Sequence, residues 1–341
     1  MRIATYNVEW FTNLFDDDGV LLEDDGWSGR QDVTRRDQLE SLAIVFTALN
    51  ADAVLVVEAP DQNGRRSTAQ ALENFARRYD LRTRKALIGF ANDTQQEIAL
   101  LYDPDVLSVR HDPIGDPTGK KGAGGAPRFD GVFRLDIDQS GTEDLIAFSK
   151  PPLEAELTTT SGRVVRLIGV HMKSKAPHGA DGPDEIMRLA ITNRRKQLAQ
   201  CIWLRARIDQ HLDAGESLIV LGDLNDGPGL DEYEKLFGRS SVEIVMGEDG
   251  GKDLHDPHAR LAVTRRVGAM PATARFYIHE EQRYLSALLD YVMLSADLAA
   301  KGAIWRIWHP FDDPVCYCTE ELREALLSAS DHFPVSVDLE I

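Results

Sequence analysis

The sequence predicts a protein in which helices and strands are mixed along the whole chain. Short, largely apolar runs with strong strand preference recur, as at residues 53–57 and 217–221. Longer segments carry apolar residues at three-and-four spacing, as at residues 34–49 and 184–211. Several apolar runs end in a carboxylate, an amide or an imidazole, and active sites of such proteins gather at strand ends.

The first half of the chain begins with an alternating, β-prone segment at residues 2–8, which predicts a strand. The acidic segment 16–25 predicts a solvated surface loop, with a lid over a site as the alternative. The further elements expected here are a helix at 34–49, a buried strand at 53–57, a helix at 67–79, strands at 98–102 and 106–110, and a loop at 115–127.

The second half repeats this mixture of strands and helices. The elements expected are strands at 131–137, 145–149, 153–159 and 163–170, a long helix at 184–211, a buried strand at 217–221, strands near 288–294 and 333–339, and a helix at 320–328. A length of 341 residues alone suggests about two domains, but no shift in composition marks a linker.

The formal net charge of −18 argues against a protein that holds polyanions through its global field. A local basic groove or a cation-filled site remains compatible with it. The three cysteines form no framework spacing, and the N-terminus lacks the pattern of a signal peptide. No stretch of 18 apolar residues predicts a membrane span. We therefore expect a cytoplasmic protein, although a removed leader would leave the same appearance.

Polar side chains with catalytic potential lie at four of the predicted strands. Glu58 and Asp223 with Asn225 follow their apolar runs, Asp290 lies within one, and Asp331 with His332 precede one. A charge amid apolar residues is costly unless it is paired or bound to metal. Each acid alone is compatible with a helix cap or an ion pair, but the group together indicates a shared site.

These segments, in this order, resemble the endonuclease/exonuclease/phosphatase superfamily, which includes pancreatic-type deoxyribonucleases, abasic-site endonucleases, sphingomyelinases and inositol-polyphosphate phosphatases. The matching segments are Thr5-Tyr6-Asn7-Val8, Val57-Glu58, Gly169-Val170-His171, Gly222-Asp223-Leu224-Asn225-Asp226, Leu289-Asp290-Tyr291-Val292 and Ser330-Asp331-His332-Phe333-Pro334-Val335. The resemblance implies an α+β fold, a four-layer αββα sandwich with two mixed, mostly antiparallel sheets. It also implies that residues 1–341 form a single catalytic domain.

The resemblance implies Mg²⁺ as cofactor, with Mn²⁺ as a substitute. Its ligands would be Asn7 and Glu58, with Glu58 the principal one, and Asp331 would assist. Mg²⁺ prefers oxygen ligands and keeps several waters, so a site with one dominant carboxylate is chemically reasonable.

The resemblance also assigns catalytic roles. Asp223 resembles the residue that activates or aligns the attacking water, and Asn225 resembles its phosphate-contacting partner. His171 resembles the imidazole that stabilises phosphate charge or assists the leaving group. His332 resembles a phosphate-contacting imidazole that Asp290 orients. An aspartate beside a histidine favours the charged imidazole, which suits contact with a phosphate.

Other polar residues leave alternatives open. Lys173 and Lys175 are candidates for binding the substrate phosphate, or they are ordinary solvated lysines. Glu97 could orient His171 from behind. The lone His178 is expected at the surface.

The leading functional hypothesis is a metal-dependent phosphodiesterase of nuclease type, with nucleic acid as the first-choice substrate and no protein partner predicted. The second is a phosphatase or phospholipase that acts on an inositol phosphate, a lipid headgroup or another small phosphate ester. The third is a non-catalytic binding module that has kept the fold. Retention of every motif residue argues against the third.

Overall fold

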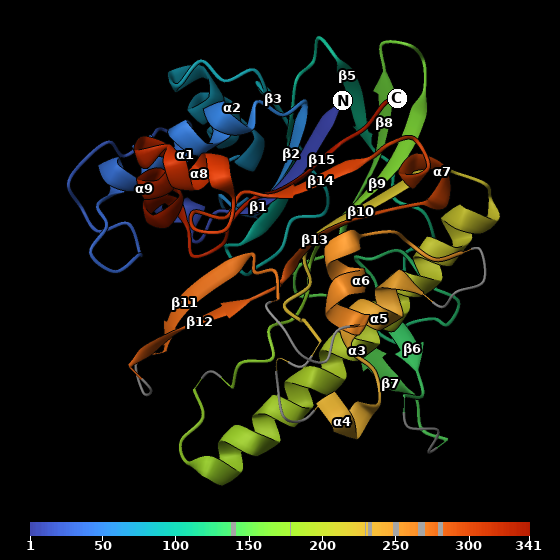
Figure 1. Ribbon diagram of the computed structural model, residues 1–341. Coiled ribbons are helices and arrows are strands. Elements are labelled where there is room, and N and C mark those ends of the chain that lie inside the picture. The colour runs from blue at the N-terminus through green and yellow to red at the C-terminus, as the bar shows by residue number, and fades with distance from the viewer. Residues whose placement is uncertain are drawn as a thin grey trace.

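Figure 1 shows two large sheets packed face to face, with helices over both outer faces. This computed structural model describes residues 1–137, 141–177, 179–228, 230, 234–247, 252–264, 270–278 and 282–341. The arrangement confirms the predicted four-layer αββα sandwich. His178 lies outside the described residues.

The first sheet has six strands, and only its central pair, β1 with β2, is parallel. In spatial order the strands are β14 (Ile304–Ile307), β15 (Val335–Asp338), β1 (Arg2–Asn7), β2 (Ala53–Ala59), β4 (Glu97–Tyr102) and β3 (Lys85–Ile88).

The second sheet has five strands, and again one pair, β9 with β10, is parallel. In spatial order the strands are β13 (Asp290–Leu294), β10 (Leu218–Asp223), β9 (Val164–His171), β8 (Leu153–Thr159) and β5 (Leu107–His111). Two small hairpins stand apart, β6 (Phe133–Leu135) with β7 (Asp144–Ile146), and β11 (Ala274–Ile278) with β12 (Arg283–Ala287).

The helices divide between the two outer faces (Figure 1). The first sheet is covered by α1 (Arg35–Leu49), α2 (Thr68–Arg78), α8 (Pro314–Cys318) and α9 (Glu320–Ala329). The second is covered by α3 (Pro183–Asp213), α5 (Ser241–Met246) and α6 (Pro257–Thr264). Shorter helices are η1 (Phe11–Leu14), α4 (Glu234–Phe237) and α7 (Ala296–Ala299). No helix within the described ranges is long and apolar enough to cross a membrane.

Alternation along the buried strands accounts for three apolar layers. In β2, Val54 and Val56 pack toward the helices, whereas Leu55 and Val57 pack between the sheets. Successive side chains of a strand point to opposite faces, so a wholly apolar strand belongs between two covered faces. The sequence run at 53–57 has this pattern because both of its faces are buried.

The strand directions bring the polar strand ends to one edge of the sandwich. Asn7 ends β1 beside Val57 of the parallel strand β2, and Asp223 ends β10 beside His171 of the parallel strand β9. The antiparallel strand β13 begins at Asp290, directly opposite Asp223. This edge lies away from the two chain termini, which Figure 1 places together at the opposite ends of the sheets.

Several expected elements differ from the structure. The strand expected at 131–137 is only Phe133–Leu135, and the one at 145–149 is Asp144–Ile146, because these two segments pair only with each other. The strands β3, β11, β12 and β14 were not expected. Each is only four or five residues long and is partly or mostly exposed, so it lacks the buried apolar run that marks the central strands.

The acidic segment 16–25 is a surface loop that is tied to its neighbours. The Arg66 guanidinium donates to the backbone oxygens of Thr12, Phe15 and Asp16. Arg35 pairs with Asp24 at 3.1 Å. These contacts confirm the surface-loop prediction.

Gly222 provides a test of how closely β9 and β10 pack. Its φ of +132° is unfavourable for other residues, and a Cβ there would lie 2.1 Å from the Val170 carbonyl oxygen. We expect Gly222→Ala to lower the free energy of unfolding by about 2–5 kcal/mol, combining backbone strain with overpacking. Urea denaturation measures this change.

Gly162→Ala is the matched control, because Gly162 also has a positive φ, +83°, but no atom lies within 4 Å of the added Cβ. We expect it to cost only about 1 kcal/mol, from strain alone. Equal losses in the two variants would contradict the proposed close approach.

Candidate active site

Glu58 occupies a distorted position at the end of β2. Its φ is +60°, and the pairing of β2 with β4 shifts register between Val57 and Ala59. Such a bulge re-aims one side chain at a sheet edge. The Glu58 carboxylate accepts a hydrogen bond from the Trp10 backbone nitrogen at 3.0 Å. Burial raises the pKa of Glu58, against the opposing effects of this hydrogen bond and of Lys150.

Asp223 is held between two amides. The side-chain nitrogens of Asn7 and Asn225 each donate to Asp223 Oδ2 at 3.2 Å. The Asn225 backbone nitrogen donates to Oδ1 at 2.7 Å. Burial, followed by the negative charge of Asp290, raises the pKa of Asp223 to about 7. A fixed carboxyl group with a pKa near neutrality has the geometry and proton affinity of a general base.

His332 and Asp290 form a buried pair. His332 Nδ1 donates to Asp290 Oδ2 at 2.7 Å, and the Thr273 hydroxyl donates to the same oxygen at 2.8 Å. Burial opposes a charged imidazole, but the neighbouring Asp290 carboxylate outweighs it, with help from Asp331 and Asp223. The pKa of His332 is therefore well above its usual value. The geometry matches the predicted orientation of His332 by Asp290.

His171 has a different electrostatic environment. Its Nε2 lies 2.9 Å from the Lys150 ammonium nitrogen and 3.7 Å from Asp223 Oδ2. Burial, followed by the positive charges of Lys150 and His332, lowers the pKa of His171 well below its usual value. A neutral His171 accepts from Lys150 at Nε2 and carries its proton on Nδ1. The buried Nδ1 has no hydrogen-bond partner.

Lys150 is a site residue that sequence reasoning missed. Its ammonium group also donates to Gln96 Oε1 at 3.2 Å. Burial lowers the pKa of Lys150 to about 8, while the nearby Glu58 and Asp223 carboxylates act in the opposite direction. Lys150 reaches the site because β8 runs antiparallel to β9, with Leu153 opposite Gly169. The chain just before β8 therefore lies beside the end of β9 at His171. The position of Lys150 can be inferred only when this strand pairing is known.

The other predicted residues lie at the margins of this group. The Asp331 backbone nitrogen donates to the Glu9 carboxylate at 2.9 Å. The Asp331 carboxylate lies 3.9 Å from His332 Nε2. Lys175 pairs with the buried Asp226. The Lys173 backbone contacts Gln200. The phosphate-binding role of Lys173 and Lys175 stays a prediction.

The possibility that Glu97 orients His171 is not borne out, because its hydrogen bonds run to other residues. Its carboxylate accepts hydrogen bonds from the Gln62 backbone, at 3.4 Å, and from the Asn92 side chain, at 2.8 Å. Burial raises the pKa of Glu97 to about 7. Glu97 therefore connects two loops beside the site, rather than orienting the imidazole.

The residues present suit a hard divalent cation. Asp223 and Glu58 are carboxylates whose charged forms burial disfavours, so a cation nearby would stabilise both. The Asp290 Oδ1 atom is buried and has no hydrogen-bond partner. Ligand atoms of Asp223, Asp290 and His332 lie within 4.8 Å of one another, but a charged His332 has no lone pair to offer a metal. The carboxylate oxygens are the donors that suit Mg²⁺ or Mn²⁺.

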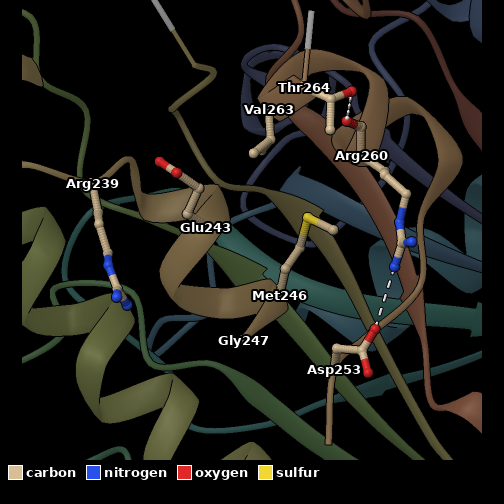
Figure 2. A pocket seen from close by; sticks show the side chains of 8 residues that line it. All are labelled: Arg239, Glu243, Met246, Gly247, Asp253, Arg260, Val263 and Thr264. Carbon is tan, nitrogen blue, oxygen red and sulfur yellow. Dashed lines mark hydrogen bonds and ion pairs between the residues drawn. The ribbon is translucent and has the colours of Figure 1, made fainter. Parts of the chain in front are cut away.

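A separate hollow lies away from these residues, at α5 and α6. Figure 2 shows its lining, which includes Glu243 and Met246 of α5 and Arg260 of α6. Its volume is about 540 Å³. Arg260 pairs with Asp253 at 3.3 Å. None of the candidate catalytic residues borders it, so it is not part of the site.

A family profile decides the identity of this group of residues. The profile described as "Endonuclease/Exonuclease/phosphatase family" matches residues 4–332, from β1 through His332. The chain belongs to this family. Membership implies a hydrolase that acts on phosphoester bonds, generally with a divalent metal. No curated protein matches the chain.

Solved structures show the same fold at low sequence identity. A family member from Bacteroides thetaiotaomicron is 14% identical, with a TM-score of 0.50, and the match covers 99% of this chain and 97% of that one. The structure of SmcL is 13% identical, with a TM-score of 0.50 and coverage of 100% and 99%. At this identity the likeness concerns the fold alone.

The His332 charge provides a test of the site's electrostatics. Without the Asp290 carboxylate, burial remains as the main influence, so Asp290→Asn should lower the pKa of His332 from above its usual value to below it. In Asp290→Asn, His332 should therefore lose its proton at acidic pH, whereas in the wild type it should keep the proton to a higher pH. NMR titration of the His332 ring measures this shift.

Asp256→Asn serves as the control, because Asp256 is a buried acid that faces His258 instead. An unchanged His332 titration in Asp290→Asn would contradict the proposed pair.

Proposed function

We propose that this protein is a Mg²⁺-dependent phosphodiesterase of nuclease type, with Mn²⁺ able to replace Mg²⁺. The observation that carries the proposal is the buried group of Asn7, Asp223, Asn225 and the His332–Asp290 pair, built from strand ends far apart in sequence. A buried carboxyl group that two amides hold beside a charged imidazole favours an active site over a binding module.

Glu58 would hold the metal at the C-terminal end of β2. Asn7 and Asp331 would supply further oxygen donors. When bound, Mg²⁺ supplies polarisation of the phosphoryl oxygen and neutralises developing charge. The raised pKa of Glu58 is consistent with this assignment, since a buried carboxylate without a cation is destabilised.

Asp223 would align and deprotonate the attacking water. Its two oxygens are fixed by Asn7 and Asn225, so the carboxyl group keeps one orientation. Water adds to phosphorus, the bond to the leaving alkoxide breaks, and the water proton moves to Asp223. Positioning of this kind supplies most of the catalysis in phosphoryl transfer.

His332 and Lys150 would stabilise the phosphate charge from two sides. His332 is held in its charged form by Asp290. Lys150 is charged below its pKa of about 8, and it lies between His171 and Gln96. The neutral His171 then positions Lys150 instead of carrying charge itself. This role differs from the two that the resemblance implies for His171, stabilising the phosphate charge or assisting the leaving group.

The proposal predicts hydrolysis of a phosphodiester in Mg²⁺ or Mn²⁺, abolished by excess chelator. His332→Ala should lower kcat by about 10²–10³-fold, because it removes one charged donor from the developing phosphate charge. The assay compares single-stranded and plasmid DNA, an abasic duplex, sphingomyelin and inositol phosphates. His255→Ala is the matched control, since His255 lies near Asp253 on the surface side.

Full activity in chelator or in His332→Ala would overturn the mechanism. Hydrolysis of sphingomyelin or inositol phosphates alone would leave the proposed mechanism intact but show that nucleic acid is not the substrate.

A further inference from the structure

The hairpin β11–β12 presents two different faces beside the site. The register places Phe276 opposite Leu285 on one face, and Tyr277 opposite Tyr284 on the other. Figure 1 shows the hairpin projecting away from the two large sheets. A two-stranded hairpin in isolation is marginally stable, so its position depends on contacts at its base.

The base of the hairpin is fixed to the catalytic residues. The Thr273 hydroxyl donates to Asp290 Oδ2 at 2.8 Å, and the Arg275 backbone nitrogen donates to the Asp331 carbonyl at 2.7 Å. The Phe333 backbone nitrogen donates to the Thr273 carbonyl at 2.6 Å. Both faces of the hairpin therefore stand at a fixed place relative to His332.

The inner face of the hairpin closes a cavity of about 300 Å³. Its walls are mainly apolar and include Phe276, Leu285, Leu230 and Leu289. Asn225 also lines this cavity, and the same residue holds Asp223. One residue therefore both lines the cavity and contacts the proposed general base, which places the cavity beside the catalytic group. Its volume is at the lower end of the range for pockets that hold small organic groups.

The outer face carries exposed rings and a cation. The Arg275 guanidinium carbon lies 3.6 Å from the Tyr284 ring centroid and 5.5 Å from that of Phe311. Tyr277 meets Tyr284 with centroids 5.1 Å apart. Tyr277, Tyr284 and Phe311 are all exposed. Aromatic rings and arginine planes are the surfaces on which unpaired bases stack.

We infer that the inner cavity takes one unpaired nucleobase next to the scissile phosphate, with Phe276 as its stacking partner, and that the outer face stacks a neighbouring base. This inference rests on the proposed nuclease-type function and narrows its substrate to single-stranded nucleic acid. A base within a duplex is stacked and paired, and extracting it costs a few kcal/mol.

The charge of the protein supports this mode of binding. A chain with a formal net charge of −18 does not hold a polyanion by its global field, so affinity must come from local contacts. Stacking provides sequence-tolerant affinity of this kind. The guanidinium plane over Tyr284 offers a stacking surface to a nucleobase, whereas an acyl chain gains no such contact from it.

The test compares KM for a single-stranded oligonucleotide with KM for the same strand made of abasic units. Phe276→Ala should raise KM for the normal strand by roughly 5- to 100-fold, as expected for the loss of one stacked base. It should leave KM for the abasic strand unchanged. Tyr317→Ala is the matched control, because Tyr317 is an exposed ring on α8, outside both faces.

A second variant keeps the test valid if Phe276→Ala loosens the hairpin. Ala190 of α3 lines the same cavity, and Ala190→Phe fills it without removing a hairpin contact. It should raise KM for the normal strand in the same way. Equal KM changes for normal and abasic strands, or equal kcat/KM for single-stranded and duplex DNA, would overturn the inference.

Binding separates this inference from the proposed function. Fluorescence anisotropy of Asp223→Asn with a labelled single strand requires no turnover, and Phe276→Ala in that background should weaken binding by the same factor. If Phe276→Ala weakens binding but the wild type hydrolyses no substrate, only the nuclease function is contradicted. If the wild type hydrolyses the strand but Phe276→Ala leaves binding unchanged, only the proposed base cavity is contradicted.

Discussion

The structure depends on the burial of several carboxylates at one edge of a sandwich. Glu58 and Asp223 both have raised pKa values, chiefly because burial disfavours their charged forms. Asp290 adds a like charge beside Asp223. Such a group is stable only when positive charge is close. The His332 imidazolium and the Lys150 ammonium supply part of it, and the proposed metal supplies the rest.

Strand direction makes this concentration of charge achievable. Each sheet contains one parallel pair, β1 with β2 and β9 with β10, whose carboxyl ends lie at the same edge. The antiparallel strand β13 begins where β10 ends. The site therefore uses the stiff core of both sheets, and Asp223 needs only short amide contacts to keep its orientation. Catalysis that relies on positioning benefits from such rigid support.

Much of this arrangement could be predicted from the sequence, because its strongest signals lie in the buried strands. The apolar runs ending at Glu58 and Asp223 marked both strands and their polar ends. Lys150 could not be found in this way, because it reaches the site through the pairing of β8 with β9. The sequence left the role of Glu97 open for a related reason. Its position at the start of β4 was clear, but its hydrogen bonds run to loops that no pattern identifies.

The hairpin β11–β12 was missed because each strand has only five residues and lacks the apolar run that marks the central strands. The hairpin matters because hydrogen bonds join its base to the catalytic residues, and no sequence pattern reveals these bonds. Thr273 joins it to Asp290, so the residues that would select a substrate share a hydrogen-bond network with those that would act on it. A change at Thr273, at the base of the hairpin, should therefore affect the His332 environment as well as the position of the hairpin.

The most direct test of the central claim is binding of Mn²⁺, measured by electron paramagnetic resonance on the wild type and on Glu58→Gln. The account predicts that the wild type binds Mn²⁺ and that Glu58→Gln, which keeps the size of the side chain but removes its charge, binds it at least tenfold more weakly. Equal Mn²⁺ affinity in the two proteins would contradict the claim that these buried carboxylates form a metal site centred on Glu58.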